Sequence, residues 1–378
     1  MTSSGGTGKR GGFSGRARSL LTIQNLAGIP SNLATLRKFM GAVNWREAQD
    51  EVAGELERKV AILGLANSGK STLFNTLKGK YSSPVSEQAG TTTTLVRGVF
   101  GPFALIDTPG HLPDLQDQAV EESSVVIYLL DAAQGLRPRD MDLIQRLRES
   151  EKPLVVALNK CDLLRESADE AAARAAARLH LKDIVPISAQ TGDNVAEELI
   201  PALIEVSPEA ALVIGRELPE YRHSAAARIV RSSTMVSLVA GLEPIPLIDI
   251  PILLSNQVHM LLRIAAVYGE PMSSQHVREL LVTVGGGLAL RYIAEEAAKV
   301  MPFGGDLVSG AIAAAGTWAM GQVAIEYFEH GKRLSGRQIN DMFGRYYRRY
   351  REENPRAEEP TPLLPAPEIV VEAGGVTE

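Results

Sequence analysis

Residues 59–71 read KVAILGLANSGKS. The apolar run Val60–Leu63 has the composition of a buried strand, and a helical pattern over Thr72–Lys78 follows the stretch. Between them, Gly64–Ser71 has the spacing G-x-x-x-x-G-K-S, which in a strand–loop–helix context is typical of a phosphate-binding loop. The stretch therefore predicts a nucleotide-binding α/β domain.

The residues of this loop have distinct predicted roles. Gly64 and Gly69 would let backbone N–H groups surround the phosphates. Lys70 would place a positive charge on the β and γ oxygens, and Ser71 would offer its hydroxyl to Mg²⁺. The predicted nucleotide contacts along the loop are Asn67, Ser68, Gly69, Lys70, Ser71 and Thr72.

Short apolar runs alternate with helical patterns downstream of the loop. Such alternation is typical of a mostly parallel sheet with helices on both faces. The predicted buried strands are Val60–Leu63, Phe103–Ile106, Val125–Leu130, Leu154–Leu158 and Ile184–Ile187, with Leu95–Phe100 as an edge partner. Because open α/β sheets bind ligands beyond the carboxyl ends of their strands, the motifs after these runs are expected at one edge.

Four motifs follow the phosphate loop. They are the threonine run Thr91–Thr94, DTPG at Asp107–Gly110, NKCD at Asn159–Asp162 and SAQ at Ser188–Gln190. In this order the chain resembles the Era-like branch of bacterial small GTPases, of the TrmE, Era and EngA type. The resemblance implies a domain over residues 58–206 that binds GTP and GDP with Mg²⁺ and hydrolyses GTP slowly without activation.

The resemblance also assigns roles within the motifs. Thr92, one of four consecutive threonines, and Asp107 would complete the Mg²⁺ shell begun by Ser71, and the Gly110 N–H would report the γ-phosphate. In the guanine site, Asp162 would accept from the ring N–H and the exocyclic amine. Lys160 would lie over the base, and the Ala189 N–H would meet the exocyclic oxygen. The predicted guanine contacts are Asn159, Lys160, Asp162, Ser188 and Ala189.

Two positions depart from the commonest small-GTPase pattern. His111 follows DTPG, where it would orient the attacking water; the alternative is a solvent-facing loop histidine. Asn67 gives the loop a form similar to GTPases that hold K⁺ beside the phosphates; the alternative is that it only shapes the loop. The predicted catalytic residues are therefore His111, Lys70, Thr92 and Asn67.

The composition limits the environment and the partners. The chain has 378 residues, a formal net charge of −6 and a pI near 5.7, so nucleic acid is not an expected partner. Its single cysteine, Cys161, excludes an intrachain disulfide and predicts a cytoplasmic protein. The polar residues 1–18 and the proline-rich, acidic residues 352–378 are expected to be disordered.

A helical lead-in is expected over residues 19–57. Asn44 precedes Trp45, and Glu47 follows three residues later, which is a capping-box pattern for a helix running toward Arg58. One interpretation is a brace that packs on the nucleotide domain, and the other is a lever that moves with the nucleotide state.

Residues 207–351 predict a second, all-helical domain. Val258, Leu261, Leu262 and Ala265 have helical spacing, and Val277, Leu280, Leu281 and Val284 repeat it. From Ala225 to Gly331 the order of PIPLIDIP, YGEP, PFGG and EYFEHG resembles a bacterial helical family that includes the YcjF-like membrane proteins.

The helical domain contains two segments that bear on membranes. Leu307–Ile325 is nineteen residues without a charge, but it is rich in alanine and glycine, so a buried helix and a bilayer span both stay open. Arg337–Arg351 interleaves arginines with aromatics, which fits either an anionic lipid surface or a solvated helix with packed aromatics. A peripheral position at the inner face of the cell membrane is one consequence.

These patterns together predict a GTP-hydrolysing switch that couples nucleotide state to membrane docking or to self-association as a homodimer. Two alternatives stay open. One is a nucleotide-dependent scaffold with negligible intrinsic hydrolysis, and the other is an Era-like GTPase associated with ribosomes or RNA.

Overall fold

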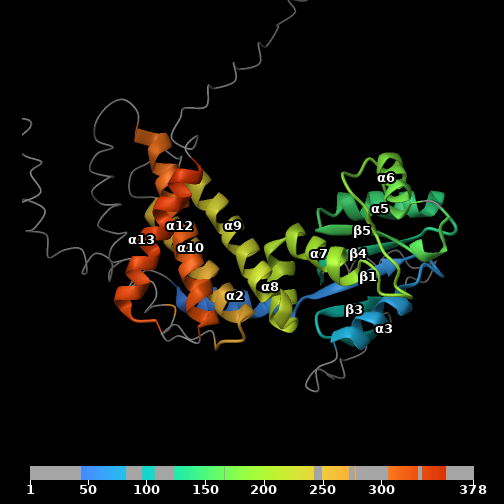
Figure 1. The fold of residues 1–378 in the computed structure, drawn as a ribbon, viewed down its shortest axis with the longest axis horizontal. Coiled ribbons are helices and arrows are strands. Elements are labelled where there is room, and N and C mark those ends of the chain that lie inside the picture. The colour runs from blue at the N-terminus through green and yellow to red at the C-terminus, as the bar shows by residue number, and fades with distance from the viewer. Residues whose placement is uncertain are drawn as a thin grey trace, which may run out of the picture.

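The computed structural model of the chain describes residues 44–81, 96–106, 123–165, 167–241, 249–271, 277, 305–330 and 334–354. Figure 1 shows an α/β domain beside a helical bundle, with α7 (Ile200–Val206) and α8 (Pro208–Glu217) between them. Every described element after α7 is helical. The predicted fold class, an α/β P-loop domain followed by an all-helical domain, is confirmed.

The α/β domain is built on one six-stranded sheet with the order β2-β3-β1-β4-β5-β6. The strands are β1 Lys59–Gly64, β2 Val96–Phe100, β3 Phe103–Ile106, β4 Ser123–Asp131, β5 Leu154–Asn159 and β6 Val185–Pro186. The edge strand β2 pairs antiparallel with β3, and all other pairs are parallel. Each predicted strand is therefore present, although β6 is shorter than expected.

Side chains alternate between the two faces of the sheet, as strand geometry requires. In β1, Val60 and Ile62 join a buried cluster with α3 (Lys70–Tyr81) and α7. Ala61 and Leu63 instead join a cluster with two helices, α5 (Pro138–Glu149) and α6 (Ala168–Leu179). Both faces are thus covered by helices (Figure 1).

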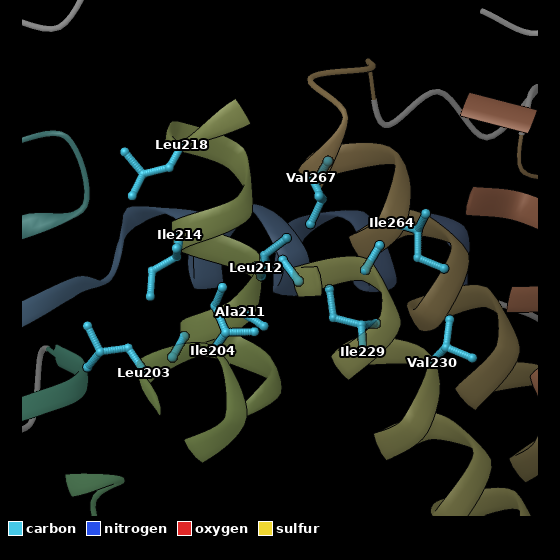
Figure 2. Packing of buried hydrophobic residues seen from close by; sticks show 14 of the residues in the cluster. Leu203, Ile204, Ala211, Leu212, Ile214, Leu218, Ile229, Val230, Ile264 and Val267 are labelled. Atoms are coloured by element: carbon cyan, nitrogen blue, oxygen red, sulfur yellow. The ribbon is translucent and has the colours of Figure 1, made fainter. Parts of the chain in front are cut away.

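The cluster on the α3 and α7 face continues into the helical bundle. Figure 2 shows Leu203 and Ile204 of α7 beside Ala211 and Leu212 of α8. The same buried cluster includes residues of α9 (Arg222–Ala240) and α10 (Asp249–Val267), namely Ile229, Val230, Ile264 and Val267. One hydrophobic core therefore joins the sheet to the bundle.

Small residues let the bundle helices approach closely. A Cβ at Gly321 of α12 (Gly305–Glu329) would lie 2.4 Å from a Val230 methyl group on α9. Polar side chains meet in the same interior: Ser237 Oγ lies 2.8 Å from Thr317 Oγ1, and Asn256 Nδ2 donates to Ser237 Oγ at 2.9 Å. This network fixes how α9, α10 and α12 align, because each buried polar atom needs its partner.

The charge-free segment predicted at Leu307–Ile325 lies within α12. Ala311–Ala315 is buried in the bundle, as the buried-helix interpretation expects. None of the helices in the described part of the chain combines the length and apolar character that a bilayer span requires.

The arginine-rich segment forms α13 (Gly336–Glu353). Its aromatic side chains pack on the domain: Tyr346 and Tyr350 contact the Trp318 ring of α12 at centroid distances of 5.7 and 5.4 Å. Its arginines at 337, 345, 348, 349 and 351 are exposed. Of the two predicted helical stripes, the one on α10 is buried, whereas only Val277 of the other lies in the described residues.

The lead-in helix is α2 (Trp45–Glu57), capped as predicted by Asn44, whose Oδ1 accepts from the Glu47 N–H at 3.3 Å. Its partners differ from the expected brace on the nucleotide domain. α2 packs against α8 and α10, where Arg263 donates to both carboxylate oxygens of Glu55 at 2.5 and 2.8 Å. The brace interpretation is corrected, because the acidic face of α2 finds its basic partner on α10.

Three short elements complete the described fold. They are η2 (Cys161–Leu163), the π-helical turn η3 (Val195–Leu199) and η4 (Pro219–Tyr221).

Candidate nucleotide-binding site

The phosphate loop connects β1 to α3. Gly69 (φ 96°) and Asn67 (φ 64°) have backbone conformations in the left-handed region, which bends the chain between strand and helix. Lys70 is the first residue of α3, and its Nζ donates to the carbonyl oxygens of Gly64 at 2.8 Å and Leu65 at 3.1 Å. The lysine ammonium therefore lies over the loop, within the curve that phosphate groups occupy in this motif.

Asn159 joins three motifs through its buried amide. Its Nδ2 donates to the Ser68 carbonyl at 2.8 Å, and its Oδ1 accepts from the Ala189 N–H at 2.8 Å. A Cβ at position 69 would lie 2.1 Å from Asn159 Nδ2, so only glycine fits there. Asn159 thus holds the phosphate loop and the SAQ segment together at one edge of the sheet.

The residues predicted to contact guanine are oriented by neighbouring side chains. Lys160, with φ 70°, directs its Nζ to Asp131 Oδ2 at 2.7 Å. Ser188 Oγ donates to Asp162 Oδ1 at 2.6 Å, and the Thr191 N–H donates to Ser188 Oγ at 3.2 Å. Asp162 as a whole is an exposed residue.

Two further contacts stabilise this edge. Thr76 Oγ1 of α3 donates to the Ala189 carbonyl at 2.6 Å, which ties the SAQ segment to the helix that follows the phosphate loop. Cys161 Sγ donates to the Leu158 carbonyl at 3.2 Å. Burial raises the pKa of the Cys161 thiol, so it stays protonated at neutral pH.

The structure brings together the predicted residues that it describes. Those from the phosphate loop, NKCD and SAQ meet beyond the carboxyl ends of β1, β5 and β6. Thr92, Asp107, Gly110 and His111 lie outside the described residues, and their roles stay predictions.

Sequence reasoning missed the contributions of Asp131 and Thr76. Asp131 directly follows the apolar run of β4, just as Asp107 follows that of β3, and this position was the available signal. The Thr76 contact had no sequence signal, because it depends on how α3 packs beside the SAQ segment.

The described residues also bear on the predicted metal. Within them, no three His, Cys, Asp or Glu side chains gather to hold a metal ion. Ser71 is an exposed residue beside Lys70, and its hydroxyl is the kind of hard oxygen ligand that Mg²⁺ accepts together with nucleotide phosphates. The chemistry of this donor fits a nucleotide-bound Mg²⁺.

The fold and this edge define a P-loop GTPase domain. The family described as 50S ribosome-binding GTPase matches residues 59–160, and a domain of unknown function (DUF697) matches residues 213–352. Over these ranges the chain contains a GTPase domain of the first family and a DUF697 domain, and it is homologous to the Era and Der GTPases. Both parts of the resemblance noted in the sequence are confirmed.

Individual relatives agree with this assignment. GTPase Era of Aquifex aeolicus is 34% identical over 174 residues, which cover 40% of this chain and 56% of the relative. GTPase Der of Syntrophotalea carbinolica is 32% identical over 200 residues, or 49% of this chain and 45% of the relative. The chain thus spans about half the length of the curated relatives that it matches. A solved structure of an Aquifex aeolicus Era variant with GDP and AlF4⁻ is 30% identical over 47% of this chain and 67% of that one, with a TM-score of 0.33.

Proposed function

We propose that this chain is a guanine-nucleotide switch that hydrolyses GTP to GDP and phosphate. The contacts of Asn159 are the observation that carries the proposal, because they join the phosphate loop to the guanine-reading SAQ segment. The position of Asp162, an exposed residue that Ser188 Oγ contacts through Oδ1, supports selection of guanine over adenine. An adenine would face mismatched donors and leave buried polar groups unpaired.

Competition between nucleotides tests guanine selection. The wild-type chain should prefer GTP to ATP by a large factor when both compete with a fluorescent GDP analogue. Asp162→Asn should shift the preference toward xanthine nucleotides, because it exchanges an acceptor for a donor at the base. Equal affinity for ATP and GTP would reject the proposed site.

The residues would divide the work on the phosphates. Lys70 would neutralise the β and γ oxygens once phosphates replace its loop carbonyl partners. Ser71, Thr92 and Asp107 would hold Mg²⁺, which when bound screens the phosphate charge. Leaving out Mg²⁺ should therefore weaken GTP binding and stop hydrolysis.

His111 would orient the attacking water. This role acts in the transition state, so His111→Ala should slow single-turnover hydrolysis by at least about tenfold while GTP-analogue affinity stays near wild type. Unchanged single-turnover hydrolysis would remove His111 from the mechanism. It would favour the alternative of a scaffold whose missing group comes from a partner.

Asn67 would help to hold K⁺ beside the phosphates. Asn67 has a left-handed backbone conformation and lies exposed at the bend of the phosphate loop, and this position supports the role. Hydrolysis should then be faster in KCl than in NaCl at matched ionic strength, and Asn67→Ala should erase the difference. Equal wild-type rates in the two salts would mean that Asn67 only shapes the loop.

The helical domain would carry the output of the switch, either membrane docking or self-association. The exposed arginines of α13 support contact with anionic lipid, and the shared hydrophobic core supports transmission from the nucleotide domain. Flotation with anionic liposomes and light-scattering mass measurement, each in GDP and GTP-analogue states, test the two outputs. State-dependent sedimentation with ribosomal subunits would instead favour the ribosome-associated alternative.

A further inference from the structure

Asp131 ends β4 with a carboxylate that is fully buried. Its Oδ1 accepts from the backbone N–H groups of Ala133 at 3.0 Å and Gln134 at 3.3 Å. Its Oδ2 accepts from Lys160 Nζ at 2.7 Å. The two oxygens therefore serve different purposes: one shapes the turn after β4, and the other receives a side chain from the guanine-reading motif.

The sheet places these two residues side by side. Asp131 pairs in register with Asn159 on the neighbouring parallel strand, and the Ala132 N–H donates to the Asn159 carbonyl at 2.9 Å. Lys160 follows directly, and its left-handed backbone turns it toward β4. Its aliphatic stem is thus held at two ends, by its own backbone and by the buried carboxylate.

We propose that Asp131 is a positioning residue for guanine recognition, because it fixes the Lys160 side chain in the conformation that packs over the base. The inference rests on the proposed function, in which Lys160 covers the ring. A long lysine side chain loses conformational entropy when it is ordered, and a partner that orders it before binding leaves less entropy to be lost with the ligand. With only 29% of the Lys160 side chain exposed, this ordering is already present in the folded chain.

A variant can separate this role from the turn. Asp131→Asn keeps an oxygen for Ala133 and Gln134 but turns the other position into an amide donor, which cannot accept from an ammonium group. The affinity of the full chain for fluorescent GDP should fall about tenfold, mainly through faster release. Affinity for IDP should fall by the same factor, because the stem contacts the ring face and not the exocyclic amine.

Asp140 provides a matched control. It is also a fully buried carboxylate, but it accepts from Tyr128 Oη and from Arg137 Nε, each at 2.9 Å, on the α5 side of the sheet. Asp140→Asn should lower the melting temperature and leave GDP affinity near wild type. If Asp140→Asn lost as much GDP affinity as Asp131→Asn, the loss would reflect the lower stability that follows from changing any buried carboxylate. That result would overturn the proposal.

A double-mutant cycle with Lys160→Met decides whether Asp131 acts through Lys160. Methionine keeps a long apolar side chain without the ammonium, so it can fill the partly buried position of the Lys160 stem. Each single variant should weaken GDP about tenfold, and the double variant should weaken it no further, because both remove the same contact. Should Asp131→Asn fail to fold, Lys160→Met still tests the contact, since wild-type GDP affinity in that variant would overturn the proposal.

The outcomes separate this inference from the proposed function. A wild-type chain that binds no GDP rejects the proposed function and this inference together. If the wild-type chain binds GDP, two results reject the inference alone. One is a GDP affinity of Asp131→Asn equal to that of the wild type, and the other is a roughly hundredfold, additive loss of GDP affinity in the double variant.

Discussion

The two faces of the central sheet have different surroundings. On the α5 and α6 face, the buried side chains form a cluster that closes within the nucleotide domain. On the α3 and α7 face, the cluster runs through α8 into α9 and α10 (Figure 2). The same strands supply both faces, since neighbouring residues alternate between them.

This difference indicates where a signal can travel. Packed cores transmit displacement because they have almost no free volume. A change at the phosphate loop can reach the helical domain through α3 and α7 without leaving the core, whereas the α5 face offers no such connection among the described residues. The predictions that follow test this asymmetry.

The largest expected effect is at the phosphate loop. Lys70→Ala should weaken GTP binding by about a thousandfold or more, roughly 4 kcal/mol, because it removes the positive charge that neutralises the β and γ oxygens. Equilibrium titration with a fluorescent GTP analogue measures the change. Lys80→Ala, on the exposed end of the same helix, should bind normally. Normal binding by Lys70→Ala would show that the site lies elsewhere.

The second effect concerns the ion pair between Glu55 of α2 and Arg263 of α10. Arg263 and Glu55 are largely buried, with 19% and 14% of their side chains exposed. Burial by itself lowers the pKa of Arg263, but the hydrogen bonds and charge of Glu55 outweigh it and raise this pKa. Arg263→Ala would leave the Glu55 carboxylate buried without its partner and should lower the free energy of unfolding by about 3 kcal/mol.

Urea unfolding followed by circular dichroism checks this value. The control is Arg231→Ala, which removes an exposed ion pair to Glu205 and should change stability by less than about 0.5 kcal/mol. Similar losses of stability in the two variants would mean that the Arg263–Glu55 ion pair contributes no more to the free energy of unfolding than an exposed pair.

A matched pair of buried isoleucines tests the two faces directly. Ile204 lies on α7 in the shared core, and Ile144 lies on α5 in the closed cluster; each is 1% exposed. Replacing either with valine should lower stability by about 1 kcal/mol. We expect GDP binding to alter the hydrogen-exchange rates of α9. Ile204→Val should make this alteration smaller, whereas Ile144→Val should leave it as in the wild type. An equal reduction in Ile144→Val would contradict the asymmetry.

The smallest effect is confined to the bundle and depends on pH. Tyr346 donates to Glu326 of α12, and burial followed by this hydrogen bond raises the pKa of Tyr346 to about 12. Because the folded chain holds this proton more tightly than the unfolded chain, the contribution to stability is full below about pH 10 and is lost as the pH rises through about 12.

Tyr346→Phe should therefore lower stability by about 0.5 kcal/mol at neutral pH and have no effect above the folded pKa. Urea unfolding at stepped alkaline pH, beside an ultraviolet absorbance titration of the tyrosines, measures both. GDP affinity at neutral pH should not change. A difference between Tyr346→Phe and wild type that is constant with pH would contradict the assignment.

The strands and the nucleotide motifs were predictable because their signals are local. Each apolar run is bounded by polar, glycine or proline residues, and the Asn44 cap marks where α2 begins. The partner of α2 was not predictable in this way. A capping box fixes the first turn of a helix, but the buried residues Ala48 and Val52 fit any apolar surface.

Long-range pairs account for the rest of what was missed. In the sequence, Asp131 is a carboxylate at the end of a strand, and its buried position makes sense only with Lys160, which lies on the next loop along the sheet. Gly321 similarly needs Val230 to explain it. The roles of Thr92, Asp107, Gly110 and His111 stay predictions.

The junction between α2 and β1 has a kinematic consequence. The helix ends at Glu57 and the strand begins at Lys59, so Arg58 alone separates them. A single residue offers two soft torsion angles, and here they are extended at φ −67° and ψ 152°. If the helical domain rotates and carries α2 with it, the torsion angles of Arg58 must change to absorb the rotation. Otherwise the rotation is transmitted to β1 as a torque. The far end of β1 is Gly64, where the phosphate loop begins.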